Sequence, residues 1–423
     1  MASSNIYFVL LHSMRFLYNL VVFLSKYNLI FLSNFNKKLK LFVDGRKETF
    51  SKIAVLKNET TIWFHAASLG EFEQARPIIE ELKQTYASYK ILVTFFSPSG
   101  YEIRKGYNLA DVVCYLPLDS KKNAQQFLEI VNPKMAIFVK YEFWPNFLYE
   151  LKRKETPTLL VSGILRENQL FFKSYGGFMR NSLQAFHHFF VQNETSKELL
   201  ASINLENVTV AGDTRFDRVS KILEQDNSLD FISEFKDNKY TVVAGSTWPE
   251  DEELLINYIN NHSVENEKFI IAPHNINEEA IQKLKKAIAK KTVLFSDKAN
   301  TDLKEFQVFI IDTIGILTKI YAAADLAYVG GGLKTGLHNI LEPATFGIPV
   351  IIGDKFSNFK EAVDLVKIGG CISIQNQKEF TENMLQLRGD KNYRTLTGTI
   401  NKKYIEDNLG ATKQIMNYLK TQL

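Results

Sequence analysis

The chain of 423 residues is long enough for two to three domains at about 150 residues each, and its 45% apolar residues provide a core for each of them. Its 51 basic and 47 acidic side chains leave a net charge of only +4, which excludes a nucleic-acid binder that works by bulk charge. Two distant cysteines in apolar runs, Cys114 and Cys371, exclude a disulfide scaffold or a cysteine metal cluster, and they indicate core residues in a reducing compartment.

The N-terminus is basic and strongly apolar. Residues 1–60 hold nine basic and three acidic side chains, so they carry +6 and the rest of the chain −2. Residues 6–35 are aromatic and aliphatic, with charges only at Arg15 and Lys26 and no signal-peptide cleavage site. Their uncharged runs are shorter than the roughly 18 to 20 residues of a span, and Arg15 at mid-depth would cost about 2.5 to 3.5 kcal/mol. We expect residues 1–36 to form an interfacial membrane anchor, with a tilted span as the alternative.

A basic cluster follows this segment directly; its members are Lys37, Lys38, Lys40, Arg46 and Lys47. Each would gain up to about 1 kcal/mol at an anionic cytoplasmic headgroup layer. The sequence therefore predicts an anchor on the cytoplasmic face of the membrane. The other interpretation is a buried hydrophobic helix of the first domain with a solvated basic edge.

Beyond residue 60, short β-branched or aromatic runs alternate with amphipathic segments, which is typical of βαβ units and parallel sheets. The first series of expected strands is 61–65, 90–96, 111–116, 135–139, 158–162, 188–192 and 208–211. The second series is 240–244, 269–272, 293–295, 308–311, 326–329, 350–352 and 371–374. The pattern predicts two α/β lobes, 37–217 and 239–395, joined by a charged linker at 218–238 and followed by a closing helix at 396–423, with a cleft between the lobes.

Several familiar sites are absent from the sequence. It has no G-x-x-x-x-G-K-[ST] loop, no G-x-G-x-x-G after the first strand and no H-E-x-x-H, so ATP hydrolysis, NAD redox chemistry and zinc proteolysis lose support. It also has no Asp-x-Asp pair of the kind that holds a cation for a nucleotide-sugar. If a nucleotide binds, protein groups must neutralise its phosphate.

The first expected strand ends at His65, and Glu71 follows at the start of a helix predicted from Phe72 to about Tyr86. Parallel α/β folds place their ligands at this carboxyl edge of the sheet. A carboxylate there can take a proton from an incoming hydroxyl; the alternative is that Glu71 serves only the helix dipole. His65 is more simply a structural residue.

Two further charged groups follow later strands of the first lobe. Glu142 follows the strand at 135–139 and could hold a substrate hydroxyl or balance a developing cation. Arg215, in the segment GDTRFD, could bind a carboxylate or phosphate through two hydrogen bonds. Each is as easily structural as functional when taken alone.

The second lobe places small and polar residues at the same edge. Ser246 and Thr247 follow its first strand, and Pro273 and His274 follow its second. We expect them to complete a phosphate and base pocket around the glycine-rich segment described next.

The segment 328–353 contains an anion-binding pattern. A strand runs into Gly330, Gly331, Gly332 and Gly336, and a helix is predicted to start near Asn339. Glycines let backbone N–H groups approach a ligand, and a helix N-terminus favours phosphate. Glu342 in the first turn could accept hydrogen bonds from the two ribose hydroxyls. The alternative is a glycine-rich turn needed only for chain reversal.

The segments HAASLGEFEQARPIIEEL, EFWPN, GDTRFD, AGSTWPEDEE and GLHNILEPATFGIPVIIG occur in the order and spacing of a known family. Together they resemble the 3-deoxy-D-manno-octulosonic acid (Kdo) transferases of the lipopolysaccharide inner core, over nearly the whole chain. The resemblance implies a GT-B glycosyltransferase with two Rossmann-like lobes, the first binding the acceptor and the second the CMP-sugar. It implies CMP-Kdo as donor, a lipid A precursor (lipid IVA) as acceptor, inversion at the anomeric carbon, no metal, no cofactor and a location on the cytoplasmic side of the inner membrane.

The resemblance also implies roles for single residues. Glu71 would be the general base, and Glu142 with Arg215 would stabilise the transition state. The donor CMP would contact Ser246, Thr247, Pro273, His274, Ile314, Gly315, Ile316, Asn339, Ile340, Leu341 and Glu342.

The chain departs from the family pattern at three places. Lys140-Tyr141-Glu142 stands where Glu-Thr-Glu is usual, Ala272-Pro273-His274 replaces Pro-Arg-His, and Ile314-Gly315-Ile316 replaces Met-Gly-Glu. The second departure removes an arginine beside the phosphate, and Lys334 is our candidate to replace its charge. Two other functions stay open on the sequence: a membrane-surface glycosyltransferase that uses a UDP-sugar, and a non-catalytic scaffold on a lipid surface.

Overall fold

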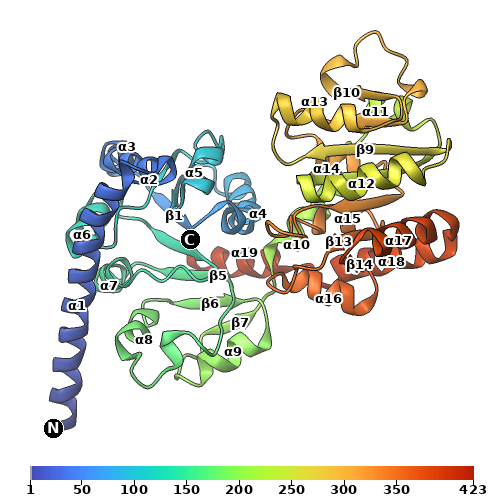
Figure 1. Cartoon of the computed structure of the whole chain (residues 1–423). Coiled ribbons are helices and arrows are strands. Elements are labelled where there is room, and N and C mark those ends of the chain that lie inside the picture. The colour runs from blue at the N-terminus through green and yellow to red at the C-terminus, as the bar shows by residue number, and fades with distance from the viewer. Residues whose placement is uncertain (1) are drawn as a thin grey trace. The chain divides into compact units, whose positions relative to one another are not determined.

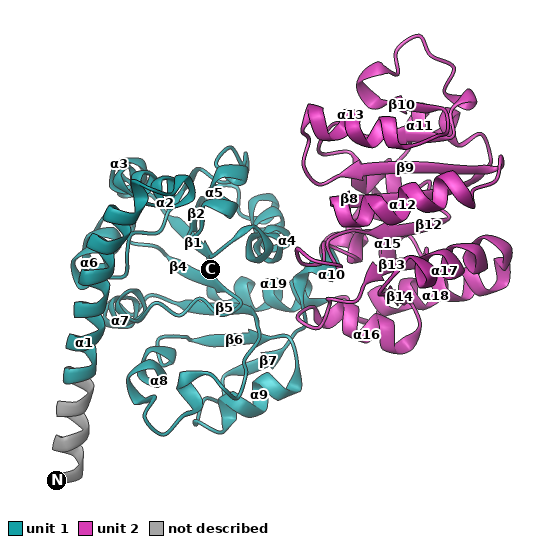
Figure 2. Cartoon of the chain, in the orientation of Figure 1, with its two compact units in different colours: residues 1–217, 410–423 teal, residues 218–409 magenta. Residues whose placement is uncertain are grey.

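The computed structural model describes the backbone of residues 2–423 and the side chains from Ser13 onward, so Met1 and the first side chains of the predicted anchor lie outside the described part. The chain divides into two compact units, Met1–Asp217 with Gly410–Leu423 and Arg218–Leu409 (Figure 2). Each unit contains a seven-stranded sheet in which every strand pair is parallel. The predicted α/β class with two parallel sheets and an apolar N-terminal helix is confirmed.

The sheet of the first unit has the strand order β3-β2-β1-β4-β5-β6-β7. Its strands are β1 (Thr61–Ala66), β2 (Lys90–Phe95), β3 (Val112–Tyr115), β4 (Met135–Val139), β5 (Thr158–Gly163), β6 (His188–Val191) and β7 (Val208–Val210). The helices of this unit are α1 (Ala2–Ser33), α2 (Lys37–Lys47), α3 (Thr49–Ile53), α4 (Leu69–Thr85), α5 (Pro98–Arg104), α6 (Lys121–Val131), α7 (Pro145–Arg153), α8 (Gly177–Leu183), α9 (Glu194–Ala201) and α19 (Ala411–Gln422), with α10 (Thr214–Ser220) at the unit boundary (Figure 1).

Both faces of this sheet are covered, which explains why its strands read as continuous apolar runs. Trp63 and Phe138 belong to one core, and Ile62 and Phe64 belong to the core on the opposite face. The period of two in the strands sends neighbouring residues to opposite faces, so a fully buried strand such as β1 needs apolar residues at every position. The carboxyl ends of β1, β4 and β7 are thereby held at one edge.

The sheet of the second unit has the order β10-β11-β9-β8-β12-β13-β14. Its strands are β8 (Tyr240–Thr247), β9 (Glu267–Pro273), β10 (Thr292–Leu294), β11 (Val308–Ile310), β12 (Leu326–Val329), β13 (Val350–Gly353) and β14 (Cys371–Ile374). Its helices are α11 (Asp230–Lys236), α12 (Pro249–Asn261), α13 (Glu278–Ala287), α14 (Leu317–Tyr321), α15 (Leu341–Thr345), α16 (Lys360–Ile368), α17 (Gln377–Gly389) and α18 (Lys391–Asp407). The predicted strand at 240–244 runs on to Thr247 through a bulge after Gly245.

The boundaries of the two compact units differ from those of the predicted domains in two places. Residues 218–238, expected to be a linker, belong to the second unit and contain α11, whose Ile232 and Phe235 are buried. The expected closing helix at 396–423 is two helices, because Gly410 adopts a positive φ of 106° between α18 and α19. Helix α19 then returns to the core of the first unit.

Helix α1 is the apolar N-terminal helix (Figure 1). Its segment Ser13–Ser33 is long and apolar enough to cross a membrane, and none of its most apolar window is buried. Large apolar side chains such as Phe16, Val21, Phe23 and Phe31 are exposed along it. A helix with this exposed apolar surface supports membrane association.

The basic cluster after α1 is only partly available to a membrane. Arg46 is half-buried, donates to the Phe42 and Phe96 carbonyl oxygens at 2.9 and 2.7 Å, and has burial lowering its pKa to about 9. Lys47 pairs with Asp44 at 2.7 Å. The expectation that all five cations face lipid headgroups is therefore wrong for Arg46, whose charge lies among Phe42, Phe96 and Tyr115.

Candidate functional site

Glu71 lies in the first turn of α4, directly after the short connection from β1. Its side chain is buried and its Oε2 accepts a hydrogen bond from the Ser68 hydroxyl. Burial and the carboxylates of Glu71 and Glu142 raise the pKa of Tyr141, which lies near both acids. The Ser68 hydroxyl therefore holds the Glu71 carboxylate at the sheet edge.

Glu142 belongs to a buried polar cluster with His65 and Trp144. The indole Nε1 lies 2.9 Å from His65 Nε2 and 3.0 Å from Glu142 Oε2, and His65 Nε2 lies 3.3 Å from the same Glu142 oxygen. On its other side, His65 Nδ1 lies 2.9 Å from Thr94 Oγ1. His65, which the sequence favoured as structural, is fully buried and positions the Glu142 carboxylate.

Arg215 is anchored by a buried acid. Its Nη2 and Nε donate to Asp213 Oδ2 at 2.8 and 3.0 Å, and Gln74 Nε2 donates to the same oxygen at 3.0 Å. Burial alone would raise the pKa of Asp213, but the charge and hydrogen bonds of Arg215 hold that pKa below its usual value. Because Gln74 lies one helical turn after Glu71 on α4, the same helix supports Glu71 and the Arg215–Asp213 pair.

The three candidate catalytic residues thus lie at one edge of the first sheet. Tyr141 lies near the charges of both Glu71 and Glu142, and Gln74 links α4 to Asp213. Sequence reasoning missed Tyr141, Trp144, Gln74 and Asp213 as supporting residues. Trp144 and Asp213 stand inside EFWPN and GDTRFD, so their place in these segments was the available signal.

In the second unit, three rings stack beside the loop after β8. The ring centroids of Trp248 and His274 are 4.7 Å apart, and those of His274 and His338 are 4.4 Å apart. Trp248 Nε1 donates to His338 Nε2 at 3.0 Å. Burial and the nearby His274 lower the pKa of His338 to about 4, and burial lowers that of His274, so neither ring supplies positive charge at neutral pH.

The glycine-rich segment after β12 packs tightly on that loop. A Cβ on Gly330 would lie 2.4 Å from the Ser246 carbonyl oxygen, and Gly331 has a φ of +88°. The Gly331 N–H donates at 2.9 Å to Asp251 Oδ2, which also accepts from the Trp248 N–H at 2.9 Å. These glycines are therefore required for close packing of the two loops, and the Gly331 amide is used inside the protein.

Two polar side chains hold the Glu342 carboxylate. Asn339 Nδ2 and Thr318 Oγ1 donate to the two Glu342 carboxylate oxygens at 3.0 and 2.6 Å. The helix expected near Asn339 begins at Leu341 and has five residues, so the contribution of its dipole is small. Ile340 and Leu341 are buried, whereas Ile314 is 81% exposed beside Gly315, which has a φ of +93°.

The other candidate residues of the second unit are Ser246, Thr247 and Lys334. Thr247 is buried and donates to Glu252 Oε1 at 3.1 Å, and Ser246 has a φ of +54°. Lys334, our candidate for the missing phosphate-side charge, donates to Glu250 Oε1 at 2.5 Å. All of these candidate CMP-binding residues belong to the second unit, whereas the candidate catalytic residues Glu71, Glu142 and Arg215 belong to the first.

Comparison with known proteins gives a consistent result. Residues 44–218 match the family model described as 3-deoxy-D-manno-octulosonic-acid transferase (kdotransferase). A 3-deoxy-D-manno-octulosonic acid transferase from Haemophilus influenzae is 26% identical over 380 residues, covering 86% of this chain and 87% of the relative. The corresponding protein from Aquifex aeolicus is 27% identical over 350 residues, covering 81% and 90%. A bifunctional glycosyltransferase/methyltransferase from Fusobacterium nucleatum is 29% identical over 373 residues, but these cover only 57% of that longer protein.

Solved structures support the fold. The MurG structure from Acinetobacter baumannii matches with a TM-score of 0.54 at 11% identity, covering 86% of this chain and 99% of that one. A UDP-GlcNAc 2-epimerase from Neisseria meningitidis matches with a TM-score of 0.55 at 15% identity, covering 86% and 100%. Similarity at this level of identity establishes the GT-B-like architecture alone.

Proposed function

This chain belongs to the family of the Kdo transferases, which are glycosyltransferases of lipopolysaccharide biosynthesis, and we propose that it transfers Kdo from CMP-Kdo to lipid IVA. We place the reaction on the cytoplasmic face of the inner membrane, with inversion at the anomeric carbon and no metal ion in the transfer step. The observation that carries the proposal is the buried Glu71 carboxylate, held at the carboxyl edge of the first sheet beside Glu142 and near the Arg215–Asp213 pair.

The proposed chemistry divides among these groups. Glu71 takes the proton of the acceptor hydroxyl as its oxygen attacks the anomeric carbon, while the bond from that carbon to the CMP phosphate oxygen breaks. Arg215 binds the sugar carboxylate through two hydrogen bonds, and Glu142 balances the oxocarbenium-like charge. Trp144 and His65 hold the Glu142 carboxylate in place.

In the second unit, we propose that CMP lies along the loops that carry Ser246, Thr247, Pro273 and His274, beside Ile314–Ile316 and the start of α15. The Glu342 carboxylate would exchange its bonds to Asn339 and Thr318 for bonds to the ribose hydroxyls. Backbone N–H groups of these loops and the Lys334 ammonium would neutralise the phosphate.

A product assay tests the proposal. The full chain is incubated with CMP-Kdo and lipid IVA, and the mass of the product lipid gives the number of sugars added. Loss of a general base costs typically 10²- to 10⁴-fold, so we expect Glu71→Gln to lower kcat within about that range while leaving CMP binding intact. Wild-type protein that releases no CMP, or Glu71→Gln with wild-type turnover, would contradict it.

The donor base is tested by nucleotide binding. A ligand that binds only the folded state stabilises it in proportion to its affinity, so CMP should raise the melting temperature and UDP should not. Equal stabilisation by UDP would favour the UDP-sugar alternative. Stabilisation by neither nucleotide would favour the non-catalytic scaffold.

A further inference from the structure

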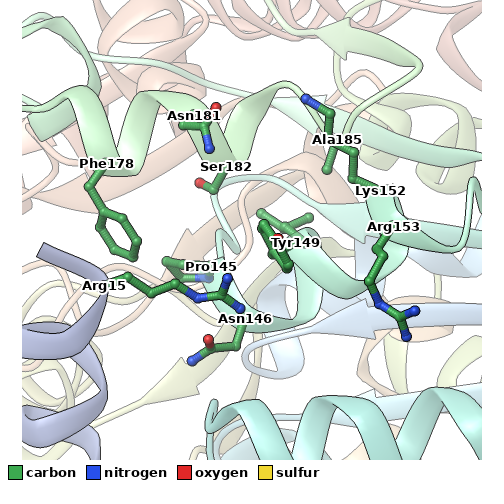
Figure 3. Close-up of a pocket in the computed structure, with 11 residues that line it drawn as sticks. Arg15, Pro145, Asn146, Tyr149, Lys152, Arg153, Phe178, Asn181, Ser182 and Ala185 are labelled. Atoms are coloured by element: carbon green, nitrogen blue, oxygen red, sulfur yellow. The ribbon is translucent and has the colours of Figure 1, made fainter. Parts of the chain in front are cut away.

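A cavity of about 450 Å³ lies in the first unit, lined by residues of α1, α7 and α8 (Figure 3). Figure 3 shows Arg15 reaching from α1 toward Pro145, Asn146 and Tyr149 of α7, with Phe178 of α8 beside it. Lys152 and Arg153, at the end of α7, also line it. Its volume lies in the range of sites that hold small molecules or headgroups.

Positive side chains outnumber negative ones around the cavity. Arg153 Nε is paired with the buried Glu150 carboxylate at 2.7 Å, whereas Lys152 donates to the neutral amide oxygen of Gln184 at 3.0 Å. The Arg15 guanidinium lies 3.8 Å from the centre of the Tyr149 ring. In the described part of the chain it forms no ion pair, although its charge acts on the buried Asp119 carboxylate. The arrangement favours an anionic ligand.

Two polar atoms in the wall of the cavity are buried without a hydrogen-bond partner. They are Arg15 Nη2, a donor, and Asn146 Oδ1, an acceptor. Asn146 is 1% exposed, and its Nδ2 donates to the Asp119 carbonyl oxygen at 2.6 Å and to Asn19 Oδ1 at 3.0 Å, which fixes the orientation of the amide. Buried polar atoms are almost always paired, so this donor and acceptor call for a ligand that offers both an anionic oxygen and a hydrogen-bond donor.

The position of Arg15 indicates where such a ligand comes from. Arg15, Tyr18, Asn19 and Val22 form the half-buried face of α1, while the rest of this helix exposes large apolar side chains. A bilayer that receives the apolar surface of α1 would bring its headgroup layer to the cavity. We infer that this cavity binds the phosphate-ester headgroup of a bilayer phospholipid, with the phosphate on Arg15 and Lys152 and an amine or hydroxyl of the headgroup donating to Asn146 Oδ1.

The test uses the full chain, glycerophosphoethanolamine as a soluble headgroup, and vesicles of phosphatidylcholine with and without phosphatidylethanolamine. We expect the headgroup to raise the melting temperature, and phosphatidylethanolamine to tighten vesicle binding because choline lacks a donor for Asn146. Arg15→Gln should abolish the melting shift and weaken vesicle binding about tenfold, the scale of one charge-assisted hydrogen bond. The matched control is Lys26→Gln, which removes the same charge from the exposed face of the same helix.

Three outcomes would overturn the inference. Equal losses in Arg15→Gln and Lys26→Gln would mean that charge alone attracts the membrane. Inorganic phosphate that stabilises the protein as well as the headgroup does would remove the headgroup from the assignment. If Arg15→Gln raises the KM for the lipid acceptor but leaves vesicle binding unchanged, the cavity belongs to the acceptor and not to a bilayer phospholipid. Lys152→Gln repeats the test without altering α1.

Discussion

The Ser68 hydroxyl holds Glu71 by a hydrogen bond, and the neutral Tyr141 side chain lies near the same carboxylate. Tyr141 directly precedes Glu142, and Ser68 directly precedes α4. At the scale of single residues, the site depends on small neutral donors that keep a carboxylate in place without cancelling its charge. Their effect on the base can be measured.

Tyr141→Phe removes a neutral hydroxyl beside the Glu71 carboxylate. A polar neutral group there favours the charged form of the base, so we expect turnover to fall about tenfold, measured by CMP release. Tyr175→Phe, at a 70% exposed tyrosine, is the control. Turnover equal to that of the wild type would show that Tyr141 does not support the base.

Lys334 and Glu250 form an exposed pair, so their roles can be separated. If Lys334 replaces the missing phosphate-side arginine, Lys334→Gln should weaken CMP binding several-fold, and Glu250→Gln should strengthen it because Lys334 is then released. Calorimetric titration with CMP measures both changes. Weaker CMP binding in both variants would instead show that the pair only holds the loop.

At the scale of elements, Asp119 joins α1 to the first lobe. Its Oδ2 accepts from the Tyr18 hydroxyl at 2.7 Å and from the Asn146 N–H at 3.1 Å, and its Oδ1 accepts from the Phe147 N–H at 3.0 Å. One carboxylate therefore satisfies the first turn of α7 and binds the apolar helix. Burial outweighs these bonds and the charge of Arg15, and it raises the pKa of Asp119 to about 6.

This raised pKa makes stability depend on pH in a defined window. Between pH 4 and 6 the folded chain binds the Asp119 proton more tightly than the unfolded chain, so the contribution of Asp119 is present below about 4 and is lost as pH rises through about 6. The shift of about two pKa units corresponds to roughly 3 kcal/mol. Urea unfolding in detergent measures the free energy of unfolding of the wild type and of Asp119→Asn. As pH rises from 4 to 6, we expect the wild type to lose roughly 3 kcal/mol of this free energy relative to the variant. A pH-independent difference would contradict it.

At the scale of the whole molecule, the chain passes between the units twice, after Asp217 and after Leu409. Asp217 accepts from the Gly410 and Thr412 N–H groups at 2.7 and 2.6 Å, so the two crossings are tied together. Helix α19 then buries Ile415, Met416 and Leu419 against the first sheet. The C-terminus of the sequence is thus part of the N-terminal unit.

Truncation after Asn408 should therefore destabilise the first unit and spare the second. Burial of each large apolar side chain contributes about 1.5 to 3 kcal/mol, so the loss of α19 removes several kcal/mol from that unit alone. Calorimetry should show an early transition for the first unit and an unchanged one for the second. Removal of only residues 421–423 is the control. Equal shifts of both transitions would contradict the prediction that α19 stabilises the first unit alone.

The sequence by itself determined the features that depend on local periodicity and on ordered motifs. Apolar runs and amphipathic segments predicted both parallel sheets, and five motifs in register predicted the family. Burial of Cys114 and Cys371 followed from their apolar surroundings. These predictions hold because β-strands buried on both faces need apolar residues at every position.

Only the tertiary structure decided features that depend on distant contacts. Four features are of this kind. They are the return of α19 to the first unit, the burial of Arg46 among aromatic rings, the support of Glu142 by His65 and Trp144, and the bond from Gly331 to Asp251. Each joins residues that are far apart in the chain or belong to different elements. A charged residue looks the same in the sequence whether it faces solvent or a buried partner. Its environment, and therefore its role, is fixed when the elements pack.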